Sequence, residues 1–334
     1  MKRRRALFFA LLLLLPIFSY ARGGKVFYRQ INPEIEPPWL TGPLIAPAAR
    51  VVPVGHYNVQ PYIYVTDYSG QYNADWDAID FNHSFWNAQL QIPLQIGCTE
   101  WMTFVLNPIL NWNYCNHKGA WRLGDLPFGF DFQLYYSPQD SAVPNVKLSL
   151  RENIPTGKYR NLNPNPFPKY LADGGGVGTW ATNVGLVFGN LYHIASVYYF
   201  DYRLLLNYTY SAPVHIKGFN YYGGGFGTNG RYFSGPSFQA DLGLEFTLSQ
   251  TWAVALDAIW TWSGKSSFTG TPGTTFEQRA PAIAGPSGVQ YSLAPAIEYN
   301  PNANFGIVAG AWFTPAGKNS LEFVSSIIAF NYYK

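Results

Sequence analysis

Residues 238–263 read FQADLGLEFTLSQTWAVALDAIWTWS and contain two segments in which apolar side chains alternate with polar or small ones. In the first segment the even positions are Phe238, Ala240, Leu242, Leu244, Phe246 and Leu248, and the odd positions are Gln239, Asp241, Gly243, Glu245 and Thr247. Successive side chains of a β-strand point to opposite faces. The stretch therefore predicts two strands, each with one face suited to lipid and one suited to water, joined by a turn at residues 249–251.

The same alternation recurs along the chain from Gly55 to the C-terminus. Segments of this kind are typical of β-strands, and we expect an all-β fold. The twelve segments lie near residues 55–66, 84–96, 101–114, 126–136, 145–154, 177–188, 192–210, 236–248, 252–263, 289–299, 304–314 and 321–333.

The connections between these segments alternate in length. Short turns lie at residues 97–100, 189–191, 249–251 and 301–303, with a slightly longer one at 137–144. Long loops rich in Gly, Pro, Asn and Ser lie at residues 67–83, 115–125, 155–176, 211–235 and 264–288, and the last loop on that side, 315–320, is small. Short periplasmic turns, long extracellular loops and an even strand number characterise bacterial outer-membrane barrels. We expect a 12-stranded antiparallel transmembrane β-barrel with both termini in the periplasm.

Composition supports a barrel over a soluble fold. The chain of 334 residues is 48% hydrophobic and 18% aromatic, but only 12% of its residues are charged, against about 25% in soluble domains. A secreted two-sheet sandwich also alternates with period 2, but it would normally carry many Lys and Glu on its wet face. Aromatic residues at segment ends predict the girdles of a barrel at the membrane interfaces: Trp86, Trp112, Tyr114, Tyr136, Trp180, Tyr208, Trp252 and Trp262.

The N-terminus has the pattern of a secretory signal peptide. Four basic residues, Lys2 to Arg5, precede an apolar run of 15 residues, 6–20, which is shorter than the roughly 20 that a membrane-spanning helix needs. We expect cleavage after Ala21 and export to the outer membrane of a Gram-negative-type bacterium. The mature chain would have 18 basic and 19 acidic residues, and this balance argues against a nucleic-acid partner.

Residues 22–54 form the second predicted part of the chain, a Pro-rich periplasmic segment without helical or strand periodicity. It is a candidate plug for a barrel formed by residues 55–334, since a barrel of twelve strands is wider than the eight-stranded kind that side chains nearly fill. A disordered tether is the alternative. Its apolar residues would pack on the inner wall: Trp39, Leu40, Leu44, Ile45, Val51 and Val52.

Ionisable residues within the predicted strands fall mostly on the face opposite to lipid. They are Asp131, Lys147, Arg151, Asp201, Arg203, Asp241, Glu245, Asp257 and Glu298. Neighbours such as Lys147 and Asp131 would pair across adjacent strands. The group predicts a polar, mildly acidic lumen, either as a neutralised structural network or as a solute path that disfavours anions.

Catalytic and metal-binding patterns are weak in this sequence. Asp77, Asp80, His83 and Ser84 form its one cluster of catalytic residue types, but no spacing defines an oxyanion site and loop composition explains the cluster. The glycine runs at 174–176 and 223–225 do not lead from a strand into a helix, so they do not predict a phosphate-binding loop. We expect no enzymatic activity, no metal and no cofactor.

Cysteines and prolines give two further expectations. Cys98 and Cys115 lie at opposite ends of one predicted strand, too far apart for a disulfide. Prolines at 61, 93, 108, 127 and 295 fall inside predicted strands, where each removes a ladder donor, so they should mark bulges or strand ends. Local curvature is one interpretation of these prolines, and a kinked wall through which an apolar solute leaves sideways is the other.

Residues 148–159 read LSLRENIPTGKY and are followed by a Gly-rich loop and by Gly178-Thr179-Trp180. This region resembles outer-membrane transporters of the phenol-degradation meta-pathway type, which are distantly similar to long-chain fatty-acid channels. The resemblance implies passage of small hydrophobic or aromatic solutes. The chain ends in Lys334, whereas such barrels commonly end in an aromatic residue that the assembly machinery recognises.

The sequence thus leads to one function and one alternative. The first is a bacterial outer-membrane channel for passive uptake of small solutes, with outer-membrane lipid, the solute and the outer-membrane assembly machinery as its partners. The alternative is a structural or adhesin-like barrel whose long loops contact a host or another envelope component.

Overall fold

The structure is a computed structural model that describes residues 38–334 except 116, 139 and 164–171. The predicted signal peptide, 1–21, and residues 22–37 lie outside the described residues. No helix within the described part of the chain is long and apolar enough to cross a membrane.

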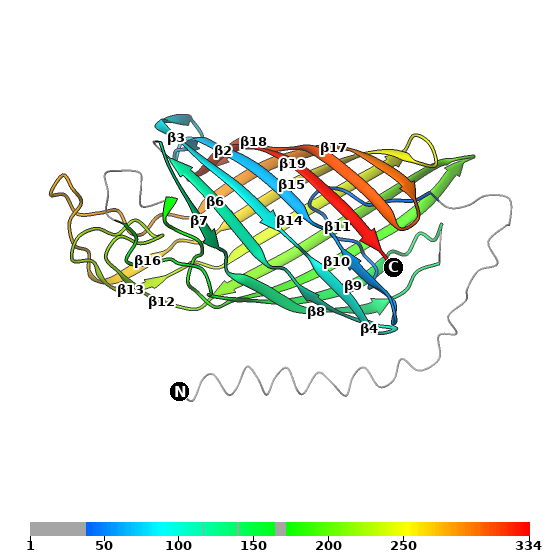
Figure 1. Ribbon diagram of the computed structural model, residues 1–334, viewed down its shortest axis with the longest axis horizontal. Coiled ribbons are helices and arrows are strands. Elements are labelled where there is room, and N and C mark those ends of the chain that lie inside the picture. Colours follow the sequence, from blue (N-terminus) through cyan, green and yellow to red (C-terminus); the bar gives the residue numbers. More distant parts are fainter. Residues whose placement is uncertain (1–37, 116, 139, 164–171) are drawn as a thin grey trace. The chain divides into compact units, whose positions relative to one another are not determined.

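The described residues form β-strands in the order that the sequence predicts, with several strands divided in two (Figure 1). Their bounds are β1 Tyr57–Val59, β2 Tyr62–Tyr72, β3 Ala78–Gln91, β4 Leu94–Thr99, β5 Met102–Leu106, β6 Ile109–Cys115, β7 Lys118–Leu123, β8 Leu126–Tyr135, β9 Asn145–Ile154, β10 Ala181–Ala195, β11 Tyr198–Ser211, β12 Val214–Lys217, β13 Asn229–Phe233, β14 Ser237–Thr247, β15 Trp252–Ser263, β16 Ser267–Thr271, β17 Gly288–Asn302, β18 Phe305–Lys318 and β19 Ser320–Tyr333.

Twelve antiparallel strands close into a barrel, as predicted. At the end where the short turns lie, the ring runs β1-β4-β5-β8-β9-β10-β11-β14-β15-β17-β18-β19, and β19 pairs with β1 through Asn58 opposite Tyr333. Lys334 exchanges two backbone hydrogen bonds with Tyr57, of 2.7 and 3.0 Å. The last residue of the chain therefore takes part in closing the barrel.

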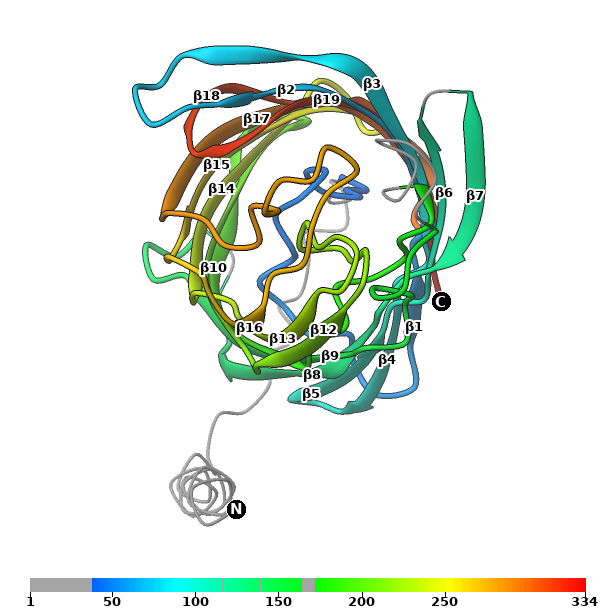
Figure 2. The same ribbon diagram turned by 90° about the vertical axis from the view of Figure 1, so that its left-hand side faces the viewer.

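At the other end the first strands follow a different course. There β19 pairs with β2, and the sheet continues from β2 through β3 and β6 to β7. Among the described residues no strand ladder joins β7 to β8. The seam between β7 and β8 is crossed instead by polar contacts from the loop that follows β9, described below. Figure 2 shows β7 on the outer side of β6, away from the other strands of the wall.

Prolines divide the strands whose pairing partners differ between the two ends of the barrel. Pro61 separates β1 from β2, Pro93 separates β3 from β4, and Pro108 separates β5 from β6, which confirms the expected strand ends. Their carbonyl groups still accept ladder bonds, for example from Ile92 to Pro108 at 3.1 Å. Pro127 is the second residue of β8. Pro295 differs, because it lies within β17 opposite Leu256, close to a register shift at Tyr291 and Leu293. Local curvature accounts for Pro61, Pro93 and Pro108. The exit of an apolar solute sideways through a kinked wall stays a prediction.

The two faces of the strands follow the predicted parity. On β15 the even positions from Trp252 to Ala258 are exposed, Leu256 at 39% for example, while Asp257 next to Leu256 is fully buried. An apolar face exposed to water would be costly over a whole barrel, so this face is suited to lipid. Of the predicted girdle residues, Trp86, Tyr136, Trp180, Tyr208 and Trp252 are exposed and Trp112, Tyr114 and Trp262 are half-buried.

Three predicted connections are wrong. Residues 67–83 do not form a long loop, because β2 and β3 extend to a tight turn in which the Asn73 side chain accepts hydrogen bonds from the N–H groups of Asp75 and Asp77. Asn and Asp close turns through such side-chain contacts, so a polar run need not be a loop. Residues 115–125 contain β7, and the predicted turn at 189–191 lies within β10, which continues to Ala195.

The loops at 211–235 and 264–288 also contain strands. β12, β13 and β16 form a separate three-stranded antiparallel sheet, here called the outer sheet, beyond the ends of the barrel strands (Figure 1). Cys98 lies in β4 and Cys115 ends β6; no disulfide joins them, as predicted.

Candidate functional site

The interior of the barrel contains the nine predicted ionisable residues, which come from strands β8, β9, β11, β14, β15 and β17. Seven of them are buried, with exposed fractions between 0% and 8%, while Arg151 and Arg203 are partly exposed. Each lies on the face opposite to the exposed apolar one. The charges separate into two groups along the wall, a division that the sequence did not predict.

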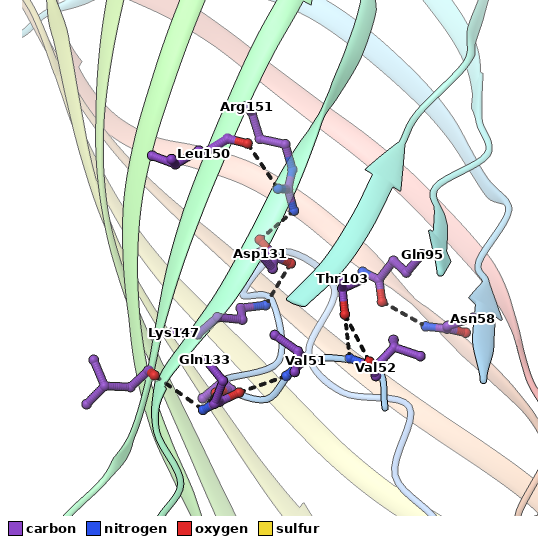
Figure 3. Close-up of polar contacts among 12 residues, drawn as sticks. Val51, Val52, Asn58, Gln95, Thr103, Asp131, Gln133, Lys147, Leu150 and Arg151 are labelled. Atoms are coloured by element: carbon purple, nitrogen blue, oxygen red, sulfur yellow. Dashed lines mark hydrogen bonds and ion pairs between the residues drawn. The ribbon is translucent and has the colours of Figure 1, made fainter. Parts of the chain in front are cut away.

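The first group joins β8 and β9 (Figure 3). Asp131 accepts hydrogen bonds from Lys147 at 3.2 Å and from Arg151 at 2.7 Å. The pairing of Lys147 with Asp131 is the one that the sequence predicts. Because two cations surround a single carboxylate, all three side chains have a partner of opposite charge, and this group acts as a structural ion-pair network.

The second group lies on β11, β14, β15 and β17 and is acidic. Arg203 contacts Asp201 at 2.7 Å and Glu245 at 3.5 Å. Asp241, Asp257 and Glu298 add three buried carboxyl groups, so this group contains one arginine and five acids. Buried carboxylates need hydrogen-bond donors or opposite charges. Two of them find donors in the N-terminal segment.

Residues 38–54, here called the plug segment, lie inside the barrel. Glu298 accepts hydrogen bonds from the backbone N–H of Thr41 at 2.9 Å and of Gly42 at 3.2 Å. Asp257 accepts from the N–H of Ile45 at 3.2 Å and of Ala46 at 3.0 Å. An ionised acceptor makes such bonds stronger than neutral ones. Two wall carboxylates therefore fix the first half of the plug segment.

Apolar packing accompanies these bonds. Leu44 is 2% exposed and packs against Ala294, Val308, Ile327 and Ala329 of the inner wall. Of the other apolar residues predicted to pack there, Val51 and Val52 are buried, and Trp39, Leu40 and Ile45 are half-buried.

The second half of the plug segment is bound by uncharged polar side chains (Figure 3). Val51 donates its N–H to Gln133 at 2.9 Å, and the backbone of Val52 both donates to and accepts from the Thr103 hydroxyl, at 2.8 and 3.1 Å. Arg50 donates to Asn145 at 3.1 Å. Gln133, Thr103 and Asn145 contact the plug segment and were not among the predicted site residues. Their place on the inward parity of β8, β5 and β9 was the signal available.

Two glycines make room for this segment. Gly42 has a φ of +105° and lies against the Arg203 guanidinium, and a Cβ on Gly97 would lie 1.8 Å from the Pro53 carbonyl oxygen. Gly97 thus lets the chain pass β4 where the plug segment leads into β1. Any side chain at Gly97 would push the two backbones apart.

A row of amide side chains lines β3 and β6. Asn87 donates to Asn113 at 2.7 Å, and Gln89 donates to Asn111 at 2.8 Å. The row continues through Gln91, which accepts from Asn107 at 3.1 Å. Amides offer both donors and acceptors. This part of the inner wall is therefore polar but carries no charge.

Inward-facing aromatic residues lie on β2, β18 and β19. Trp312 and Phe323 meet edge to face with centroids 4.9 Å apart, and Tyr68 lies 6.0 Å from Phe323. Tyr62 and Tyr64 stack at 5.7 Å and pack on the cluster around Leu44. Tyr68 and Phe323 also line a cavity of about 310 Å³, together with Thr261, Ser263, Val289, Gln290, Asn319, Ser320 and Leu321.

The loop after β9 covers the seam between β7 and β8. Asp125 accepts from the N–H groups of Gly157 at 2.9 Å and Val177 at 2.7 Å. Asn113 and Asn111 donate to the carbonyl oxygens of Gly174 at 2.6 Å and Gly175 at 3.2 Å. The glycine run is thus bonded to β6, and the residues on either side of it are bonded to the connection between β7 and β8.

Asp173 in this loop forms ion pairs with Arg122 of β7 and with Lys158. Partial burial acts to raise the pKa of Asp173, but the hydrogen bonds from Lys158 and Arg122 outweigh it and hold that pKa below its ordinary value. The ionised form of Asp173 is therefore the one that fastens the loop.

The acidic cluster considered for catalysis does not form a site among the described side chains. Asp77 lies in the turn after β2 and Asp80 lies in β3, while the side chains of His83 and Ser84 lie outside the described part. Within the described residues, no group of three or more His, Cys, Asp or Glu could hold a metal ion. The absence of catalysis and of a cofactor stays a prediction.

Comparisons with known proteins identify the fold. The crystal structure of an outer membrane channel from Pseudomonas putida F1 matches with a TM-score of 0.63 and 13% identity, over 86% of this chain and 98% of that one. The translocator domain of the autotransporter NalP from Neisseria meningitidis matches with a TM-score of 0.45 and 9% identity, over 83% and 87% of the two chains. No protein-family model and no curated protein matches the sequence. The fold is that of outer-membrane β-barrels of Gram-negative bacteria.

Proposed function

We propose that the protein is an outer-membrane channel for passive uptake of small solutes, and that the plug segment closes its lumen at rest. The observation that carries the proposal is the position of residues 41–52 inside the barrel, held by side chains of the wall. These contacts are hydrogen bonds and one apolar cluster, and the segment forms no strand ladder with the wall within the described residues. Contacts of this kind can break and reform without unfolding the barrel.

The solutes we propose are small and hydrophobic or aromatic, as the resemblance of residues 148–180 to phenol-degradation transporters implies. The aromatic group of Tyr68, Trp312 and Phe323 supports this class, because aromatic rings pack well edge to face or offset against one another. The cavity beside Tyr68 and Phe323 adds Thr261, Ser263 and Gln290, which suit a polar substituent on a ring.

The acidic group gives the path its charge preference. Arg203 balances part of the charge of Asp201 and Glu245, while Asp257 and Glu298, which accept backbone hydrogen bonds, add further negative charge to the same stretch of wall. When the plug segment leaves, Asp257 and Glu298 lose their backbone donors and face the path. We therefore expect anionic solutes to pass less readily than neutral ones.

A structural or adhesin-like barrel is the alternative function. Solute uptake by proteoliposomes separates the two, with the full chain compared with a variant lacking residues 22–50. We expect the variant to admit phenol faster than glucose or a nucleoside, and the anion benzoate more slowly than phenol. A correctly folded variant that admits none of these probes would exclude the channel. The outer-membrane assembly machinery as a partner stays a prediction.

A further inference from the structure

The outer sheet extends the barrel wall beyond the membrane-spanning strands. β12 follows β11 after Ala212 and Pro213, β13 precedes β14, and β16 follows β15. In register, His215 lies opposite Arg231, which lies opposite Thr269; Lys217 lies opposite Asn229 in the next row. Three neighbouring strands of the wall thus continue as three neighbouring strands of the outer sheet.

One face of the outer sheet is apolar and covered. Val214 and Ile216 are 5% and 0% exposed and pack with Ile283, Tyr222 and Phe268. Tyr222 and Ile283 belong to the loops that follow β12 and β16. Figure 2 shows these loops extending from the outer sheet toward the middle of the ring. The covered face therefore points toward the barrel axis, and the other face points away from it.

The outward face is basic and exposed. Its polar and charged residues include His215, Lys217, Asn229, Arg231, Thr269 and Thr271, all of them exposed, and the exposed pair Phe233 and Ser267 lies on the same face next to the barrel strands. The strands read VHIK, NGRYF and SFTGT, so none of them contains an acidic residue. Lys217 and Arg231 lie diagonally across adjacent strands on this face, so one bound anion would interact with both cations.

The level of this face relative to the membrane follows from the strands below it. Tyr208 and Tyr210 near the end of β11 are 45% and 55% exposed on the lipid side. Exposed aromatic residues at strand ends mark the membrane interface. Lys217 follows Tyr210 by seven residues, or at most about 23 Å of extended chain. The basic face therefore lies within about 23 Å of this interface, on the long-loop side of the barrel.

We propose that the outward face of the outer sheet binds the phosphorylated head groups of lipopolysaccharide, the glycolipid of the outer leaflet. Charge complementarity supports this partner: the Arg231 guanidinium matches a phosphate group through paired N–H donors, Lys217 adds a second cation, and the Asn and Thr side chains add hydrogen bonds. This inference depends on the outer-membrane location and not on transport, so failure of solute uptake would leave it intact.

Binding of purified lipopolysaccharide to the full-length protein in detergent micelles tests the proposal. We expect the variant Lys217→Gln/Arg231→Gln to bind at least tenfold more weakly, and dephosphorylated lipopolysaccharide to bind weakly to both proteins. The control variant Lys118→Gln/Arg279→Gln removes two exposed cations outside the outer sheet and should bind as the unchanged chain does.

Three outcomes would overturn the proposal. They are equal binding by the two variants, equal binding of the dephosphorylated glycolipid, and complete competition by millimolar inorganic phosphate, which would indicate a site for free anions. Heat-dependent gel mobility of each variant verifies that its barrel is folded, so weak binding cannot be ascribed to unfolding.

Discussion

The carboxylate of Glu298 on β17 accepts a 2.9 Å hydrogen bond from the backbone N–H of Thr41, so a residue late in the chain holds one of the first described residues inside the barrel. Asp257 on β15 holds Ile45 and Ala46 in the same way. Together they use buried negative charge of the wall to orient a segment that has no regular structure of its own.

Removing these carboxylates should loosen the plug segment. In the variant Asp257→Ala/Glu298→Ala four backbone N–H groups lose their acceptors, and hydrogen bonds to charged groups contribute about 1.5–3 kcal/mol each. We expect faster proteolysis near residues 38–54 and more frequent channel openings in planar bilayers. Glu298→Gln keeps an acceptor and should give a smaller effect. Glu152→Ala removes an acid that is bonded to Thr182 and should change neither measurement.

The two faces of β14 should respond differently to charge. Leu244 lies on the lipid side and Gln239 on the inward side of the same strand. We expect Leu244→Arg to lower the free energy of unfolding by about 2–4 kcal/mol, because a charge near the bilayer midplane is poorly solvated. Gln239→Arg should cost clearly less. Equal losses in reversible unfolding experiments would show that the assignment of faces is wrong.

Acid should release the loop that covers the seam between β7 and β8. The pKa of Asp173 is lowered in the folded protein, so its stabilising effect is present above the ordinary aspartate pKa of about 3.9 and is lost as pH falls through the lower, folded value. Hydrogen exchange of residues 172–178, corrected for intrinsic rates, should therefore accelerate at acidic pH. Asp173→Asn should exchange quickly already at neutral pH. Equal protection of this loop in the unchanged chain and in Asp173→Asn at neutral pH would contradict this role.

The direction of the barrel in the membrane can be tested by labelling. Thr271 and Asn229 are paired across β16 and β13, and Asn302 ends β17 at the opposite, short-turn end. Cysteine reporters at Thr271 and Asn229 should react with an impermeant reagent on whole cells, and one at Asn302 should not. The reverse pattern would place the termini outside.

The sequence predicted the features that depend on alternation. The inward position of Asp257 between Leu256 and Ala258 follows from parity alone, as do the strands of β14 and β15 and the pair Lys147–Asp131. Loop lengths were less predictable, because Asn73 closes a five-residue turn with its own side chain where composition indicated a long loop.

The hydrogen-bond partners of the plug segment could not be predicted from the sequence. Glu298 and Asp257 accept hydrogen bonds from backbone N–H groups, which every residue except proline carries. The residue types at positions 41–46 therefore do not identify the carboxylates that bind them. The seam between β7 and β8 could not be predicted either, because Arg122 and Asp173, which are in contact there, are 51 residues apart in the sequence.

The single-channel conductance of a variant lacking residues 22–50 tests the central claim most directly. If the plug segment closes the lumen, the variant should form a folded barrel with a higher conductance than the full chain in planar bilayers. An unchanged conductance, with rapid proteolysis of this segment in the intact protein, would show that it is a tail and contradict the account.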